Sequence, residues 1–354
     1  MLRLELQPRP TASRFMRLGA PLLALLLTVM VTAPMLALAG LPPLQTLRIF
    51  FLTPLSTANG ISEWLLKASP LILIGLGLTV GFRANVWNIG AEGMYTIGAI
   101  CAGWLALRYG DGTHFWLLPA MMIAGALGGA AWAAIPAFLK TAANTSEILV
   151  SLMLNYVAAL LLSYLVNGPL QDPQGLNYPQ TALFGPAATF STPFPGMRIN
   201  ASIGITLVAI AAAWLLLERS FLGFQLSVSG SAPAAARYAG FNQTRLTWLS
   251  LLISGATAGL AGMMEAAGPL GQLTPVISPG YGFAAIIVAF IGRLRPIGVV
   301  IGGLLLSLLY LGGEAVQMSL NVPASLSRTF QGALLFFLLA GDVLILHRVR
   351  LRRH

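Results

Sequence analysis

Long apolar runs, separated by short polar segments, make up most of the chain. A membrane-crossing helix needs about 20 predominantly apolar residues, and only helices and closed barrels satisfy their backbone groups in lipid. The pattern therefore predicts an all-α integral membrane protein, a polytopic bundle of about ten transmembrane helices. The expected crossings are 18–39, 64–80, 85–107, 115–139, 148–166, 201–217, 246–267, 268–291, 297–311 and 329–346.

Proline and glycine interrupt this pattern most strongly between Gly268 and Gly282. Three prolines and four glycines in this stretch exclude a continuous helix. Irregular backbone at membrane depth is tolerated only where protein or water surrounds it. We therefore expect irregular or broken segments near 83–95 and 268–296, and the second of them is a candidate lining for a polar pathway.

Glycines recur at spacings of three or four inside two of the runs. Gly125 and Gly129 lie in 115–139, while Gly255, Gly259 and Gly262 lie in 246–267. Small residues at such spacings let transmembrane helices approach closely. We therefore expect both helices to pack tightly against a neighbour.

The polar segments divide one transmembrane domain, 1–354, into inside and outside parts. The first run has 22 residues (18 to 39), which exceeds the apolar core of a signal peptide, about 7 to 15 residues. We expect it to be retained, and cleavage after Ala39 stays open as the alternative. Most of the 20 Lys and Arg then fall inside, as the positive-inside rule requires. The expected segments are a cytoplasmic N-terminus 1–17, an external loop 167–200, a cytoplasmic loop 219–245 and a cytoplasmic tail 347–354.

Composition supports the membrane assignment and excludes other classes. Of 354 residues, 57% are hydrophobic and 8% are charged, with a mean hydropathy of +0.81, whereas a soluble domain carries about a quarter charged residues. The net charge of +10 comes from arginines at the chain ends and in short loops, so we expect contact with the lipid bilayer and no nucleic-acid partner. Cys101, the one cysteine, cannot form an intramolecular disulfide.

Three polar side chains fall inside an apolar region just after Arg83. If a helix starts at Asn85, then Asn85, Asn88 and Glu92 are spaced i, i+3 and i+7 and form one polar stripe. Ionisable groups at membrane depth are costly, and they usually face a bundle interior or a water-filled path. These three residues are therefore candidates for the substrate pathway. In the alternative, Glu92 caps a helix start or pairs with Arg83.

Two further polar residues are candidates for the same pathway. Asn155 lies near the middle of 148–166, where its amide either binds a substrate or joins two helices. Glu265 lies toward the outer end of 246–267, where it either lines the outer mouth or sits among lipid headgroups. The sequence leaves both alternatives open.

The chain lacks the motifs of an enzyme. A phosphate-binding loop requires Lys-Ser or Lys-Thr after a glycine, but the two lysines, Lys67 and Lys140, follow leucines. The three histidines, His114, His347 and His354, form no cluster with metal-ligand spacing. We therefore expect no catalytic residue, no metal and no cofactor on this chain, and the energy for transport must come from a partner or an ion gradient.

Several stretches, in order along the chain, carry a likeness to one known family. They read VWNIGAEG at 86–93, TSEI at 145–148, MLNY at 153–156, PAAARYAG at 233–240, SPGYGF at 278–283 and AFIG at 289–292. These stretches resemble the permeases of bacterial ATP-binding-cassette (ABC) importers, in the group that carries branched-chain amino acids, simple sugars and nucleosides. The first stretch looks like the nucleoside branch, and the likeness runs from about Gly75 to Leu311.

This resemblance implies a permease subunit in the bacterial inner membrane, with both termini cytoplasmic. The implied partners are a cytoplasmic ATP-binding subunit that uses the ATP, a second permease subunit that is a non-identical paralogue, and an extracytoplasmic substrate-binding protein. The expected cargo is a nucleoside or a similar polar uncharged solute, because a charged cargo would need a fixed counter-charge. The alternatives are simple sugars or branched-chain amino acids in the same importer class, or an ion-coupled secondary transporter with Glu92 or Glu265 as the ion site.

The cytoplasmic loop 219–245 contains a candidate docking element for the ATPase. A proline stands at the first position of a short predicted helix, good helix formers follow, and a glycine ends it. This stretch resembles the family's coupling region, and an ordinary interfacial turn is the alternative. The candidate coupling residues are Pro233, Ala236, Arg237, Tyr238 and Gly240.

Overall fold

The computed structural model of the chain forms two compact units. The terminal unit comprises Met1–Ile61 and Leu308–His354, and the central unit comprises Ser62–Ser307. The structure describes residues 2–8, 23, 26–34, 36–37, 40, 42–110, 112, 114–193, 196–321, 325, 329, 332–333, 336–337, 340–341 and 347–353. The expected crossing 18–39 is described only at 23, 26–34 and 36–37, and the expected crossing 329–346 lies largely outside the described residues, as does the alternative cleavage point at Ala39.

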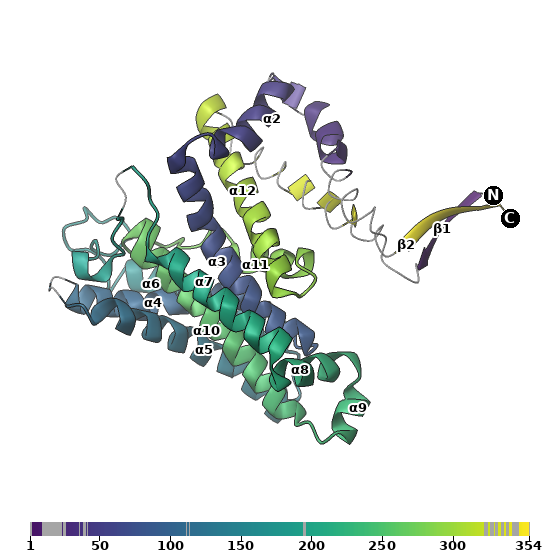
Figure 1. Ribbon diagram of the computed structural model, residues 1–354. Coiled ribbons are helices and arrows are strands. Elements are labelled where there is room, and N and C mark those ends of the chain that lie inside the picture. Colours follow the sequence, from purple (N-terminus) through teal and green to yellow (C-terminus); the bar gives the residue numbers. More distant parts are fainter. Residues whose placement is uncertain are drawn as a thin grey trace. The chain divides into compact units, whose positions relative to one another are not determined.

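The central unit is built from helices joined by short turns and one long loop (Figure 1). The helices are α3 (Ala58–Arg83), α4 (Ala91–Tyr109), α5 (Leu117–Ala143), α6 (Glu147–Val166), α7 (Ala201–Trp214), α8 (Phe221–Ser231), α9 (Pro233–Tyr238), α10 (Gln243–Glu265), α11 (Tyr281–Ile291) and α12 (Pro296–Leu320). Of these, α3 and α12 continue into the terminal unit. A π-helical turn extends α7 over Leu215–Arg219, and another extends α10 over Ala266–Leu270.

Helix α3 runs through the interior of the central unit. Every residue from Ala68 to Phe82 is buried, which fits a sequence that is apolar on all sides of the helix. The one hydroxyl near its end, Thr79 Oγ1, donates to the Gly75 carbonyl at 2.8 Å and is thereby satisfied within the helix. This stretch of α3 is therefore packed against protein on all its sides.

Glycines bring α4, α5 and α10 into close contact. A Cβ at Gly98 on α4 would lie 2.2 Å from the Gly259 Cα on α10, and a Cβ at Gly129 on α5 would lie 2.1 Å from the Gly255 carbonyl oxygen. Figure 1 shows these three helices lying along one another. The tight packing expected from the glycine spacing in 115–139 and 246–267 is confirmed.

The predicted multi-pass helical architecture is confirmed, but the expected count of about ten crossings is not. Helix α11 has 11 residues and spans about 16 Å at 1.5 Å per residue, against a hydrocarbon core of about 30 Å. Residues 271–280 before it have no regular secondary structure, as the prolines and glycines predicted. Among the described residues, six helices are long and apolar enough to cross a membrane: Ala58–Arg83, Leu117–Ala143, Glu147–Val166, Ala201–Arg219, Gln243–Leu270 and Pro296–Leu320.

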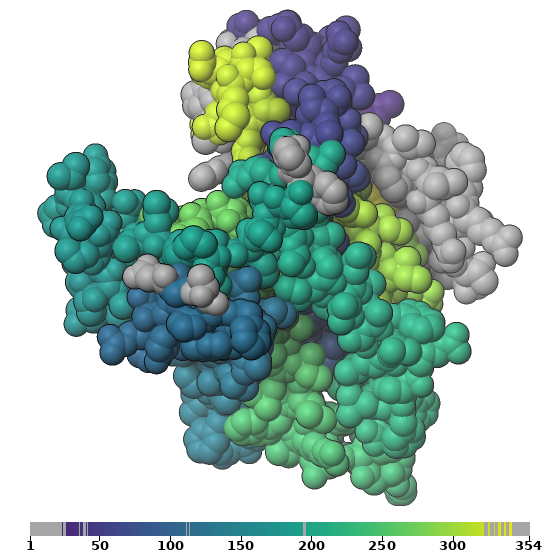
Figure 2. Space-filling view, turned by 60° about the vertical axis from the view of Figure 1, so that its left-hand side comes forward, coloured from purple at the N-terminus to yellow at the C-terminus, as the bar shows by residue number. Residues whose placement is uncertain are grey.

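The long loop 167–200 is largely non-helical, as expected, and it is anchored to the segment that follows α10. The Thr181 N–H donates to the Leu273 carbonyl at 3.1 Å, and the Phe184 N–H donates to the Gly271 carbonyl at 2.7 Å. Figure 2 shows the surface of this loop in teal, next to the blue surface of α4 and α5. The loop therefore covers an irregular part of the central unit.

The terminal unit contains the one departure from the all-α class among the described residues. Strand β1 (Leu2–Pro8) pairs antiparallel with β2 (His347–Arg353), so the two ends of the chain form a two-stranded ribbon. Helix α2 (Pro43–Leu52) follows, with a 3₁₀ turn at Thr53–Leu55. Pairing between chain ends is the most non-local contact a chain can make, and no local pattern signals it.

Candidate functional site

The segment between α3 and α4, residues 84–90, is not helical. Asn85 has a left-handed backbone with φ of 56°, and α4 begins only at Ala91. The Asn88 Oδ1 accepts a hydrogen bond from the Gly90 N–H at 2.9 Å, and such a side-chain contact competes with helix formation. The expected stripe of Asn85, Asn88 and Glu92 on one helix face is therefore wrong.

Helix α6 holds this segment through a polar stripe of its own. The Ser151 Oγ accepts from the Ile89 N–H at 3.2 Å. The Asn155 amide donates from Nδ2 to the Ile89 carbonyl at 3.0 Å and accepts at Oδ1 from the Gly93 N–H at 2.8 Å. A Cβ at Gly90 would lie 2.8 Å from the Ser151 Cβ, so glycine is needed for this close approach. Of the two alternatives for Asn155, the structure shows the one that joins segments of the protein.

The same stripe begins one turn earlier, at Glu147. Its Oε1 forms a salt bridge with Lys140 at the end of α5 and faces the Trp87 N–H at 3.4 Å. Glu147 is 8% exposed, so this carboxylate is buried with its counter-charge beside it. The stripe therefore ties α5, α6 and residues 87–93 together.

Asn88 points to the opposite side of the segment, toward α10. Its Nδ2 donates to the Ser254 Oγ at 2.8 Å and lies 3.2 Å from the Met94 Sδ, and the residue is 1% exposed. Together with the bond to Gly90, these contacts use both ends of its amide. Asn88 and Asn155 thus hold the segment between α6 and α10.

Glu92 caps the start of α11. Its Oε2 accepts from the Gly282 N–H at 2.6 Å, in the first turn of that helix, where an anion is favoured by the helix dipole. The Ser278 Oγ accepts from the Gly280 and Tyr281 N–H groups at 3.1 and 3.0 Å and completes the cap. Of the alternatives for Glu92, the capping role is therefore the one observed.

Aromatic rings join the other end of α11 to the same segment. The Phe290 ring stacks on Phe82 of α3 with centroids 5.2 Å apart, and on Trp87 with centroids 5.8 Å apart. Because Glu92 follows the segment and Trp87 lies within it, a shift of the segment acts on both ends of α11.

Arg83, the last residue of α3, connects three parts of the central unit and does not pair with Glu92. Its Nε donates to the Leu294 carbonyl at 2.8 Å, in the turn between α11 and α12. Its two terminal nitrogens bond the Leu217 carbonyl at 3.0 Å and the Glu218 carboxylate at 2.5 Å, where α7 ends. Sequence reasoning considered Arg83 only as an alternative partner for Glu92. The one available signal was an isolated arginine at the end of an apolar run.

The remaining two candidates are Asn85 and Glu265. Asn85 is exposed, and its Oδ1 accepts from the Trp87 Nε1 at 3.0 Å. Glu265 is the last residue of α10, half-buried where the π-helical turn begins.

Tyr95 on α4 is a residue that the sequence did not single out. It is fully buried, and its hydroxyl has no hydrogen-bond partner within the described residues. Its ring lies edge-on to Tyr281, with centroids 6.4 Å apart.

The predicted short helix in the 219–245 loop is present as α9. Pro233 stands in its first turn, and Gly240 beyond its end has a left-handed φ of 77°. Ala236 is fully buried, whereas Arg237 is exposed and Tyr238 is 98% exposed. One face of α9 therefore packs on the protein, and the other presents a cation and an aromatic ring.

The last turn of α8, which leads into α9, rests directly on the end of α3. A Cβ at Gly230 would lie 2.1 Å from the Arg83 carbonyl oxygen. A continuous series of contacts therefore runs from α9 to Arg83, through residues 84–90, and on to Glu92 and α11.

A family profile described as "branched-chain amino acid transport system / permease component" matches residues 60–339, which include every element of this series. The chain belongs to this family of permeases. The resemblance seen in the sequence motifs is confirmed, and the permease family accounts for the long apolar helices. No solved structure matches the chain.

Curated relatives of this permease are ABC transporter subunits. The glucose ABC transporter permease protein TsgB13 of Haloferax volcanii is 34% identical over 98% of this chain and 94% of its own length. The nucleoside ABC transporter permease protein NupB of Lactococcus lactis is 28% identical, over 90% of this chain and 89% of its own. The guanosine ABC transporter permease protein NupP of Bacillus subtilis is 32% identical, over 75% and 76%. The relatives are therefore transport subunits rather than enzymes.

Proposed function

We propose that this permease carries nucleosides, or similarly polar uncharged solutes, as the membrane-spanning subunit of an ABC importer. The proposal places it in the bacterial inner membrane with both termini in the cytoplasm. It works there with a cytoplasmic ATP-binding subunit, a second and non-identical permease subunit, and an extracytoplasmic substrate-binding protein. This chain binds no cofactor, and the partner subunit uses the ATP.

The observation that carries the uncharged cargo is that two carboxylates, one partly buried and one buried, are already engaged within the protein. Glu92 is engaged by the first turn of α11, and Glu147 is engaged by Lys140. A charged cargo would require a fixed counter-charge in the pathway. Neither carboxylate is available for that purpose, because each already stabilises a contact within the protein.

The pathway is proposed to run along residues 86–93 and the irregular stretch 271–280. Asn88 and Asn155 give this part its shape by holding backbone groups, while Asn85, Glu92 and Glu265 are its further polar candidates. Non-helical backbone of this kind is tolerated at membrane depth where it lines a cavity, and permeases use such segments at their substrate sites.

Energy is proposed to enter through α9, the coupling helix. Its exposed Arg237 and Tyr238 present a docking face to the ATPase, while its buried Ala236 faces the permease. When ATP closes the ATPase, a displacement of α9 acts on Arg83 and the 84–90 segment, and through them on α11. The ATPase thereby shifts the population between outward and inward states.

Glucose or another simple sugar is the second candidate cargo. One observation favours it: the similarity to a glucose permease extends over 98% of this chain. A hexose is also polar and uncharged. The engagement of Glu92 by α11 and of Glu147 by Lys140 therefore suits it equally. Membership of an ABC permease family decides against the ion-coupled carrier.

The test is uptake into liposomes that contain the chain with its candidate ATPase, second permease and binding protein. Labelled guanosine, glucose and leucine are compared with and without ATP, and an ionophore removes ion gradients. ATP-dependent guanosine uptake is the expected result. ATP-dependent glucose uptake would keep the importer and replace the cargo, whereas ATP-independent uptake that the ionophore abolishes would overturn the proposal.

A further inference from the structure

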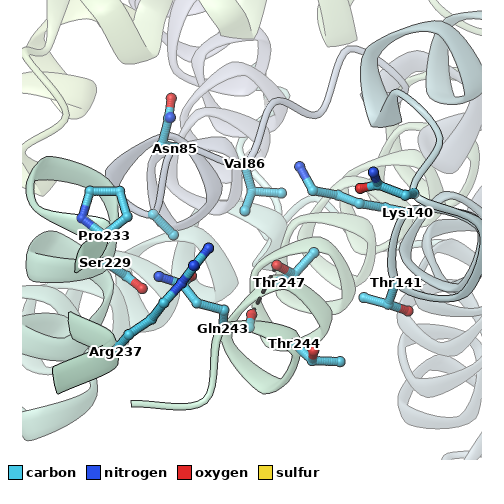
Figure 3. Close-up of a pocket in the computed structure, with 12 residues that line it drawn as sticks. Asn85, Val86, Lys140, Thr141, Ser229, Pro233, Arg237, Gln243, Thr244 and Thr247 are labelled. Atoms are coloured by element: carbon cyan, nitrogen blue, oxygen red, sulfur yellow. Dashed lines mark hydrogen bonds between the residues drawn. The ribbon is translucent and has the colours of Figure 1, made fainter. Parts of the chain in front are cut away.

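An open pocket of about 370 Å³ lies between α9 and the end of α5. The 84–86 stretch forms one wall, and the start of α10 forms another (Figure 3). Figure 3 shows Arg237 and Ser229 entering from the side of α8 and α9, and Lys140 entering from the side of α5. The transport mechanism above uses Arg237 and the 84–90 segment, but it assigns no ligand to the pocket between them.

The pocket carries positive charge. Arg237 and Lys140 both line it, and no acidic side chain does. Lys140 is partly neutralised by Glu147 behind it, but the Arg237 guanidinium has no hydrogen bond or ion pair within the part of the chain that the structure describes. A planar guanidinium without a partner, facing an open pocket, suits an oxyanion that accepts two parallel hydrogen bonds.

A second observation comes from Ser229. This residue is 3% exposed, and its Oγ has no hydrogen-bond partner among the described residues although it lines the pocket. Most buried hydroxyls in proteins are paired, because an unmade hydrogen bond is costly. The Ser229 hydroxyl therefore lacks an acceptor, and a group bound in the pocket would supply one once the side chain turns toward it.

We propose that this pocket binds a small phosphate-bearing anion. The Arg237 guanidinium takes two phosphate oxygens, the Ser229 hydroxyl donates to a third, and Lys140 adds a point charge from the far side. The volume exceeds that of phosphate alone and lies within the range of small-ligand sites, so a nucleoside monophosphate also fits. Inorganic phosphate and a nucleoside monophosphate share the chemistry that the site recognises.

Occupancy has a consequence for transport that rests on the proposed function. A ligand held by both Arg237 and Lys140 ties α9 to α5 and opposes the displacement of α9. Phosphate-bearing ligands therefore slow uptake from the cytoplasmic side. The binding itself requires neither the cargo nor the ATPase, although Arg237 belongs both to the pocket and to the proposed docking face.

The experiment measures equilibrium binding of inorganic phosphate and of adenosine monophosphate to the full-length chain in nanodiscs of uncharged lipid. Excess adenosine is present throughout, so that any nucleoside site in the pathway is filled. Saturable binding of either probe is expected. Ser229→Ala should weaken it roughly tenfold, since it removes one hydrogen bond to a charged group, and Arg237→Gln should abolish it.

Arg245→Gln is the matched control, because Arg245 is an exposed arginine at the start of α10 that does not line the pocket. It should bind both probes as the unaltered chain does. Binding of phosphate alone identifies the free ion as the ligand, and binding of adenosine monophosphate alone identifies a nucleotide. Absence of saturable binding, or equal loss in Arg245→Gln and Arg237→Gln, would overturn the proposal. Failure of uptake in liposomes would leave this result untouched.

Discussion

The carboxylate of Glu92 accepts a hydrogen bond from the Gly282 N–H at 2.6 Å and thereby joins the first turn of α4 to the first turn of α11. The two residues are so close that a Cβ at Gly282 would lie 2.3 Å from the Glu92 N. An ionisable group that sequence reasoning placed in a pathway is thus part of a contact between helices, at the point where α11 begins.

This contact predicts that the charge of Glu92 matters less than its ability to accept a hydrogen bond. Glu92→Gln keeps an acceptor, so it should lower the free energy of unfolding by about 1 kcal/mol or less and keep ATP-dependent uptake. Glu92→Ala leaves the Gly282 N–H unpaired and should cost about 1–3 kcal/mol. Thermal unfolding in detergent and uptake in liposomes measure both. Loss of uptake in a stable Glu92→Gln protein would instead assign its charge to transport.

Asn155 provides a second prediction. Asn155→Ala leaves the Ile89 carbonyl and the Gly93 N–H without partners, at about 1–3 kcal/mol for each buried group. Asn167 is the matched control, since it is an exposed asparagine just past the end of the same helix, and Asn167→Ala should cost about 1 kcal/mol or less. Equal losses of unfolding free energy in the two variants would show that the Asn155 amide does not hold the segment.

Close packing of glycines predicts opposite effects of one substitution at two positions. A Cβ at Gly259 would lie 2.2 Å from the Gly125 carbonyl oxygen, so Gly259→Ala should destabilise the protein by about 1–3 kcal/mol or more. Gly204 on α7 has nothing within 4 Å of its Cβ position, and Gly204→Ala should stabilise by up to about 1 kcal/mol. Thermal unfolding measures the change in stability of each variant. Destabilisation by Gly204→Ala would contradict the expected open space beside Gly204 on α7.

Much of this packing and of the coupling loop was predictable from the sequence. A proline at 233 and a glycine at 240 mark a helix of the observed length, because each acts through its own backbone. The prolines between Gly268 and Gly282 likewise exclude helix locally, and the structure has none over 271–280. Glycine spacing predicted the close approach of α5 and α10 to a neighbour for the same reason, because the absence of a side chain follows from the residue type alone.

The candidate site was less predictable, because its partners are distant in the chain. Asn88 donates to Ser254, and Asn155 donates to the Ile89 carbonyl. These partners are far along the chain, whereas helix spacing considers only residues three or four positions away. The stripe on α6 that bends residues 86–90 away from a helix is 60 or more residues further along. Arg83 likewise reaches Leu217 and Leu294, contacts that no periodicity encodes.

Arg83 gives a prediction about coupling. Lysine keeps the charge, but its single ammonium nitrogen cannot reach the three acceptors that the guanidinium contacts through three nitrogens, so Arg83→Lys should lower uptake roughly tenfold while ATP hydrolysis by the assembled importer persists. Arg219 is the control in the adjacent turn: it lies over the Trp214 ring at 5.0 Å, and Arg219→Lys should retain uptake. Parallel loss of hydrolysis and uptake in Arg83→Lys would indicate failed assembly rather than failed coupling.

Tyr238 predicts where the ATPase docks. The side chain is 98% exposed, so Tyr238→Ala should leave the folding and insertion of the permease unchanged. An exposed aromatic residue at an interface typically contributes enough binding energy that its loss weakens affinity roughly tenfold or more. Tyr238→Ala should therefore reduce co-purification of the ATPase and abolish most uptake.

Tyr178, 64% exposed in the 167–200 loop, is the matched control. Tyr178→Ala should bind the ATPase normally, because that loop is proposed to lie on the other side of the membrane. Normal ATPase binding and uptake by Tyr238→Ala would remove α9 from the docking surface, and loss of ATPase binding in Tyr178→Ala would reverse the proposed orientation.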